Sequence, residues 1–81
     1  MKVFEFLEKI ALFHSLLIRE NTGNAERFAE KLNVSRATIY NIIEELKSFD
    51  IEIEYSRSRE TYYYKYPHKV KIYISIQQID N

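Results

Sequence analysis

The stretch NAERFAEKLNVSRATIYNIIEELK, residues 24–47, decides the fold. Its pattern predicts two helices joined by a tight turn. Asn24 suits the N-cap of the first helix, since its side-chain oxygen can accept a backbone N–H from the first turn. Asn33 lies where the chain must turn, and asparagine tolerates the left-handed conformation better than most residues other than glycine. Ser35 then caps the second helix. Apolar residues in that helix recur at helical spacing and form an inward stripe: Ile39, Ile43 and Leu46.

This stripe leaves one edge of the second helix facing outward near its N-terminal end. The edge carries six candidate DNA contacts: Ser35, Arg36, Ala37, Thr38, Tyr40 and Asn41. Arg36 can bond guanine in a bidentate way, and Asn41 can do the same to adenine. Ala37 or Thr38 suits a thymine methyl group. The hydroxyl groups of Ser35 and Tyr40 suit phosphate oxygens. The alternative is an ordinary solvated helix face.

The run FAEKLNVSRATIYNIIEEL, residues 28–46, resembles the helix-turn-helix of winged-helix regulators, in particular the biotin-repressor-like and deoxyribonucleoside-repressor-like groups. The resemblance extends over residues 4–66. It implies an α+β winged-helix fold and a small transcriptional regulator whose second motif helix enters the major groove. Two positions depart from the family pattern. Asn33 stands where glycine is common, and Ile42 stands where a polar residue is common.

Residues 3–19 predict a first helix whose apolar stripe is wider than a small domain needs. One explanation is a helix clamped between the other two helices and the strands, and the other is a homodimer seam along this helix. His14 lies on the apolar side and is expected to be a satisfied interior or interface residue. Gly23 is expected to end this helix or lie in the loop after it, and Thr22 can supply a very short strand before the motif.

A β-hairpin is predicted after the helix-turn-helix, which is the position of a wing. Residues 51–55 alternate between apolar and acidic side chains, residues 56–60 form a polar loop, and residues 61–66 form a second strand. Phe49, just before the hairpin, is expected to fill the core beneath the second motif helix. Three tyrosines share one face of the second strand and can cover the core: Tyr62, Tyr64 and Tyr66. Stacking of tyrosines on exposed bases is the less favoured alternative.

Residues 69–76 alternate again and predict an extra antiparallel strand beside the wing. This strand can instead pair with its copy in a second chain, because an exposed apolar edge invites pairing. We therefore expect a single winged-helix domain over residues 1–76, with the helix-turn-helix at 24–47, the wing at 51–66 and a tail at 77–81.

The wing tip is the second candidate site. Arg57 and Arg59 alternate around a serine-rich loop and can contact the DNA backbone or enter the minor groove. Lys31 and Lys65 are weaker phosphate candidates. Residues 55–71 contain five basic residues and one acidic residue, so this segment is locally positive. The alternative is a solvated charged tip that discourages aggregation.

The whole chain is neutral, with 12 basic and 12 acidic residues among 81. Neutrality disfavours strong non-specific DNA binding and keeps open a rival hypothesis, a winged-helix protein-interaction module. Glu44 and Glu45 on the motif helix and the unexpected Ile42 also favour that rival.

The residue types also bear on whether the chain can hold a ligand or catalyse a reaction. Without cysteine, metal-ligand spacing or a catalytic motif, we expect no enzyme activity, metal or cofactor.

The absence of a signal peptide and of a membrane-spanning stretch indicates a soluble cytoplasmic protein. The expected partners are double-stranded DNA and, through the first helix or the C-terminal strand, a second copy of the chain.

Overall fold

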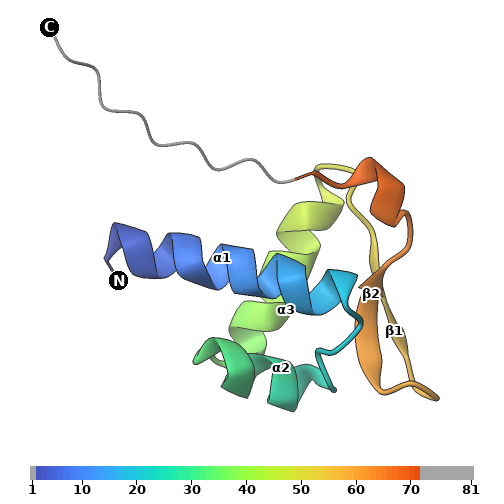
Figure 1. The fold of residues 1–81 in the computed structure, drawn as a ribbon, viewed down its shortest axis with the longest axis horizontal. Coiled ribbons are helices and arrows are strands. Elements are labelled where there is room, and N and C mark those ends of the chain that lie inside the picture. The colour runs from blue at the N-terminus through green and yellow to red at the C-terminus, as the bar shows by residue number, and fades with distance from the viewer. Residues whose placement is uncertain (1, 72–81) are drawn as a thin grey trace, which may run out of the picture.

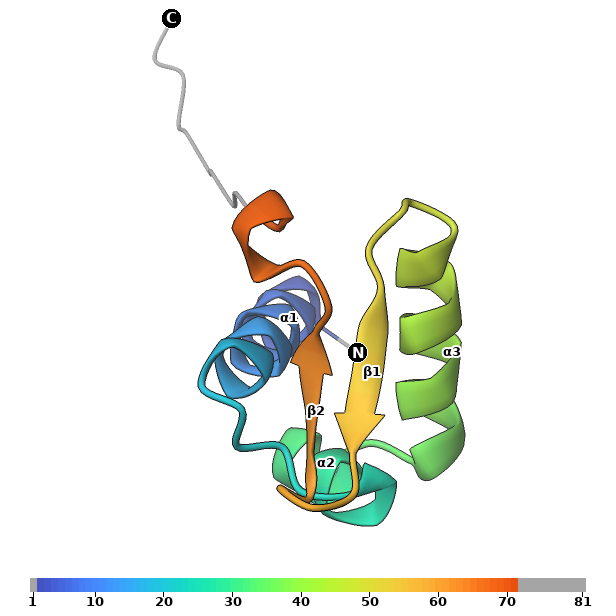
Figure 2. The ribbon, with the colours of Figure 1, turned by 90° about the vertical axis from the view of Figure 1, so that its right-hand side faces the viewer.

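Three helices precede a two-stranded antiparallel hairpin in the computed structural model, which describes residues 2–71 (Figure 1). The helices are α1 (Val3–Ile18), α2 (Ala25–Leu32) and α3 (Arg36–Lys47). The hairpin consists of β1 (Ile53–Ser56) and β2 (Thr61–Tyr64), and the short 3-10 helix η1 (Pro67–Lys69) follows. Figure 2 shows α1 and α3 on opposite sides of the hairpin, with α2 across one end. This arrangement confirms the predicted α+β winged-helix fold.

The predicted capping residues begin and end the motif helices. Asn24 Oδ1 accepts the backbone N–H of Arg27 at 2.9 Å and caps α2. Asn33 ends α2 in the left-handed conformation, with φ 55° and ψ 49°. Ser35 Oγ accepts the backbone N–H of Thr38 at 3.1 Å and caps α3. These local bonds set the turn between α2 and α3, because they fix where one helix stops and the next begins.

The core lies between the three helices and β2. Phe28 and Ile39 are fully buried, and the ring of Phe13 stacks on that of Phe28 with centroids 4.9 Å apart. The remaining core side chains are Leu16, Leu17, Ala29, Leu32 and Tyr64. The predicted inward stripe of α3 is present, since Ile43 and Leu46 are half-buried beside Ile39. Ile42 also packs against this cluster, so its apolar character has a structural role.

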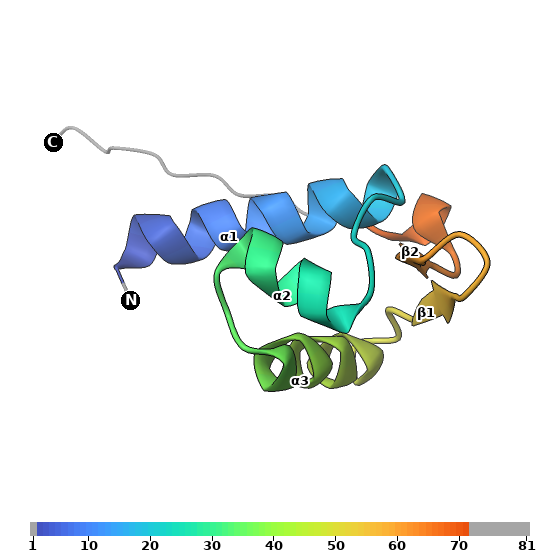
Figure 3. The same ribbon diagram turned by 90° about the horizontal axis from the view of Figure 1, so that it is seen from below.

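Only the C-terminal half of α1 contributes buried side chains to the core. His14, in that half, places Nδ1 2.8 Å from the hydroxyl of buried Tyr64, as expected of a satisfied interior histidine. The other half extends past α2 and α3 (Figure 3), and there Phe4 is 68% exposed and Phe6 53% exposed. The clamped-helix explanation therefore accounts for half of the wide apolar stripe and leaves the rest uncovered.

The loop between α1 and α2 joins the hairpin through a short parallel bridge between Gly23 and Thr61. The buried Thr22 hydroxyl accepts the backbone N–H of Tyr62 at 2.8 Å, and the Thr22 backbone N–H donates to Thr61 Oγ1 at 3.1 Å. Gly23 has φ 73°, and a Cβ there would come within 2.8 Å of Arg27 Cβ. The expected short strand thus exists as a single bridge beside Thr22.

The hairpin is shorter than predicted. Its register pairs Ile53 with Tyr64 and Ser56 with Thr61, so β1 begins two residues late and β2 ends two residues early. Beyond the strands, the Lys65 backbone N–H still donates to the Glu52 carbonyl at 3.0 Å.

The prediction that Phe49 fills the core is wrong, because its side chain is 75% exposed. The chain tightens after α3, where the Phe49 N–H donates to the Leu46 carbonyl at 3.0 Å. Asp50 then takes a positive φ of 63° and reverses the chain. Ile51, the residue after Asp50, packs against the core in place of Phe49.

The predicted extra strand at residues 69–76 is wrong at its start. Proline favours the first turn of a helix, and here Pro67–Lys69 form η1, closed by the Val70 N–H on the Pro67 carbonyl at 3.1 Å. The rest of that strand, residues 72–76, and the tail at 77–81 lie outside the described residues. Within residues 2–71, no helix has the length and apolar character to cross a membrane.

Candidate nucleic-acid interface

The outward edge of α3 is arranged as the sequence predicted. Ile39 points into the core, and five of the six candidate residues around it are exposed: Ser35, Arg36, Ala37, Tyr40 and Asn41. The sixth, Thr38, is half-buried, and its hydroxyl lies 2.9 Å from the Ser35 hydroxyl. Capping therefore engages Ser35 and Thr38 with each other, which leaves the larger polar side chains as the better candidates for base contacts.

The wing tip lies at the same end of the molecule as the beginning of α3 (Figure 2). Arg57 is exposed there. Arg59 folds back instead, and its guanidinium group pairs with the carboxylate of Glu20 and lies over the ring of Tyr63, 4.9 Å from the centroid. Both arginines thus lie at the wing tip, and among the contacts of the described residues only Arg59 is held by neighbouring side chains.

Neither of the two weaker candidates lies at the wing tip. Lys65 follows β2 and therefore lies at the opposite end of the hairpin from the tip, where its Nζ is 3.7 Å from a Glu54 carboxylate oxygen and 5.5 Å from the Tyr66 ring centroid. Lys31, near the end of α2, donates from Nζ to the Asn21 carbonyl at 2.7 Å. Both lysines already have partners within the protein, and the structure does not bring them to the α3 edge.

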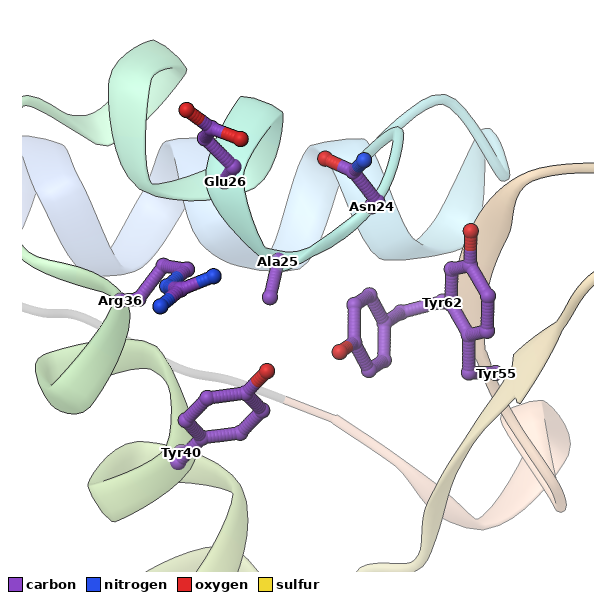
Figure 4. Close-up of a pocket in the computed structure, with 7 residues that line it drawn as sticks. All are labelled: Asn24, Ala25, Glu26, Arg36, Tyr40, Tyr55 and Tyr62. Atoms are coloured by element: carbon purple, nitrogen blue, oxygen red, sulfur yellow. The ribbon is translucent and has the colours of Figure 1, made fainter.

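A shallow cleft joins the beginning of α3 to the wing. We call it the tyrosine cleft, and it has a volume of about 310 Å³ and is lined by Asn24, Ala25, Glu26, Arg36, Tyr40, Tyr55 and Tyr62. Figure 4 shows the Tyr62 hydroxyl directed toward Tyr40, with the Arg36 guanidinium on the α2 side. The rings of Tyr55 and Tyr62 pack across the hairpin with centroids 4.7 Å apart. Residues from α2, α3 and both strands therefore meet beside the candidate α3 edge.

The Tyr62 hydroxyl group in the tyrosine cleft is neutral at physiological pH. Burial raises the pKa of the Tyr62 phenol above its usual range, and the neighbouring Tyr40 raises it further. A neutral phenol can donate a hydrogen bond to a phosphate oxygen or to a base acceptor. Only one guanidinium group, that of Arg36, adds positive charge to the lining, and Glu26 opposes it.

Tyr62 packs against the core as the sequence predicts, but the sequence alone places neither Tyr62 nor Tyr55 beside α3. The signal that identifies them is the register of the hairpin, which pairs Tyr55 with Tyr62 one step from the tip. To predict that register, the exact ends of both strands must be known. The alternation of apolar and polar residues located those ends only to within two residues.

The two halves of α3 differ in charge. A second hollow, beside the C-terminal half, is lined by Ile43, Glu44, Lys47, Glu52, Ile53 and Glu54. Three carboxylates and one lysine make this hollow acidic, so it would repel a phosphate backbone. The beginning of α3 is therefore the end suited to DNA.

Comparison with known protein families matches residues 9–65 to the model described as "HTH domain". The match spans α2, α3, the hairpin and most of α1. A search of curated proteins and a search of solved structures each found no match. The family match supports a helix-turn-helix DNA-binding domain, and it does not distinguish the biotin-repressor-like group from the deoxyribonucleoside-repressor-like group.

Proposed function

We propose, for a chain that belongs to the HTH domain family, sequence-specific binding of double-stranded DNA as a small cytoplasmic transcriptional regulator. The observation that carries this proposal is the orientation of α3. Its first two turns expose Arg36, Tyr40 and Asn41 while Ile39 between them is fully buried. A helix held in this way can place polar side chains on base edges without disturbing the core.

In the proposed complex, α3 enters the major groove by its N-terminal half. Arg36 and Asn41 read bases, and Ala37 or Thr38 meets a thymine methyl group. Ser35 and Tyr40 bind phosphate oxygens.

The wing grips the flanking backbone or the minor groove. Arg57 and Arg59 supply its positive charge, and Lys31 and Lys65 contribute less because neither lies at the wing tip. A domain of this size makes few contacts, so useful specificity is expected from a symmetric pair on two half-sites.

The test begins with selection of binding sites from random duplex DNA. The doubly substituted chain Arg36→Ala, Asn41→Ala is then compared with wild type on the selected and on scrambled duplexes. Loss of one bidentate pair costs about 1–3 kcal/mol of discrimination, so the variant should lose most of its preference. Lys47→Ala is the matched control, because Lys47 is an exposed cation at the other end of α3. Equal weak binding of every duplex by wild type and variant would refute base reading by α3.

A second function, that of a protein-interaction module, is favoured by the zero net charge and the acidic hollow beside Glu44. The packing of Ile42 against the core removes one argument for it. Duplex affinity measured over a range of salt concentrations separates the two. Affinity that falls steeply with salt supports DNA binding, whereas no affinity at low salt, together with capture of a defined protein partner, supports the module.

A further inference from the structure

The outer face of α1 carries apolar side chains that the core does not cover. Phe4 is 68% exposed, Ile18 is 47% exposed, Ala11 is exposed and Leu7 is half-buried. Spacings of three, four and seven residues place these four on one side of the helix. We call this side the α1 seam. It faces away from Phe13, which is buried on the core side of the same helix.

We propose that the α1 seam is the interface of a homodimer in which two α1 helices pack antiparallel. Pairing about Ala11 sets Phe4 of one copy against Ile18 of the other and brings the two Ala11 residues together. A small residue at the centre lets the helices approach closely, and large apolar residues at both ends fill the remaining space.

The charges beside the seam favour the antiparallel direction. Glu5 and Glu8 are exposed near the N-terminal end of α1, and Arg19, which keeps helical backbone angles, is exposed at its C-terminal end. Glu8 and Arg19 are eleven residues apart, about three turns, so they lie on the same side of the helix. An antiparallel pair brings Arg19 of each copy to the acidic end of the other, whereas a parallel pair brings like charges together.

The position of α1 keeps the candidate DNA contacts accessible. Because α1 and α3 lie on opposite sides of the hairpin, pairing through α1 leaves both α3 helices uncovered (Figure 2). The dimer does not depend on DNA, so its existence is tested separately from the proposed function.

Sedimentation equilibrium of the chain without DNA, over a micromolar concentration series, tests the interface. Wild type should fit a monomer–dimer equilibrium. Ala11→Arg puts two guanidinium groups at the twofold axis, and the dimer should weaken by about tenfold or more. Arginine is a good helix former, so circular dichroism should show a helix content equal to wild type. Phe49→Ser, which removes an exposed phenylalanine outside α1, should leave the equilibrium unchanged. A strictly monomeric wild type, or equal effects of the two variants, would overturn the proposal.

A charge exchange tests the direction. Arg19→Glu should weaken the dimer about two- to fivefold, the size expected of an exposed ion pair. Adding Glu8→Arg to that variant should recover part of the lost affinity, because opposite charges again lie on neighbouring turns of the two paired helices. A double variant that dimerises no better than Arg19→Glu alone would overturn the antiparallel arrangement.

Discussion

The guanidinium group of Arg59 at the wing tip is paired with the carboxylate of Glu20 in the loop after α1. Both side chains are about half exposed, so the pair by itself adds little to stability. Its consequence concerns DNA, since it places a negative charge beside the cation proposed to contact phosphate. Glu20 must therefore share Arg59 with the duplex or release it.

The change Glu20→Gln is expected to strengthen DNA binding and to increase its salt dependence. Without the carboxylate, Arg59 is available for one more phosphate contact, which adds about 0.9 to the slope of log K against log salt. Affinity titrations at four or more salt concentrations measure this slope. Glu30→Gln on α2, which removes an exposed carboxylate elsewhere, is the control. If both variants show the wild-type slope, Glu20 does not restrain Arg59.

A second prediction concerns the turn between α2 and α3, where Asn33 has a positive φ of 55°. Alanine in the left-handed conformation is strained by roughly 1–2 kcal/mol, whereas glycine is not. Asn33→Ala should lower the free energy of unfolding by about 1 kcal/mol, and Asn33→Gly should leave it nearly unchanged. Urea denaturation of the three chains measures the difference. Equal loss in both variants would show that the asparagine side chain, not the backbone angle, matters here.

The parts of this fold that can be predicted from the sequence are those set by local signals. Asn24, Asn33 and Ser35 act within a few residues of themselves, so their capping roles follow from residue type and spacing. The alternation after α3 was enough to predict a hairpin, and position in the chain was enough to identify it as a wing.

The errors arose where distant contacts determine the outcome. Phe49 is apolar and close in sequence to core residues, yet Asp50 turns the chain so that Ile51 packs against the core instead. The pairing of Arg59 with Glu20 joins residues 39 apart in sequence, and no local pattern predicts it. The tyrosine cleft likewise requires α2, α3 and the hairpin in their final positions.

A third prediction concerns alkaline pH. Burial raises the pKa of the Tyr64 phenol to about 12, from about 10 in an unfolded chain. Below pH 10 the phenol is neutral in both states. Between pH 10 and 12 only the unfolded chain releases the proton, so the free energy of unfolding falls as pH rises through this window, by about 2 kcal/mol.

Tyr64→Phe isolates that effect. The variant should lose about 1 kcal/mol at neutral pH, because the hydroxyl no longer bonds His14 Nδ1. Its free energy of unfolding should fall less steeply than that of wild type between pH 10 and 12, since the other titrating groups are common to both chains. Guanidinium denaturation across this range makes the comparison, and parallel curves would contradict the assignment.

The last prediction concerns the tyrosine cleft, which adjoins the α3 edge and opens between it and the wing. A backbone strand flanking the major groove would pass this cleft, where Tyr40 and Tyr62 can donate their hydroxyl hydrogens to phosphate oxygens. Tyr40→Phe and Tyr62→Phe should each weaken DNA binding by up to about tenfold, and equally on selected and scrambled duplexes, because phosphate contacts carry no base preference. Tyr66→Phe is the matched control, since Tyr66 is also exposed but lies beyond the other end of β2. A loss confined to the selected duplexes would indicate base contacts instead, and an equal loss in Tyr66→Phe would remove the cleft from the interface.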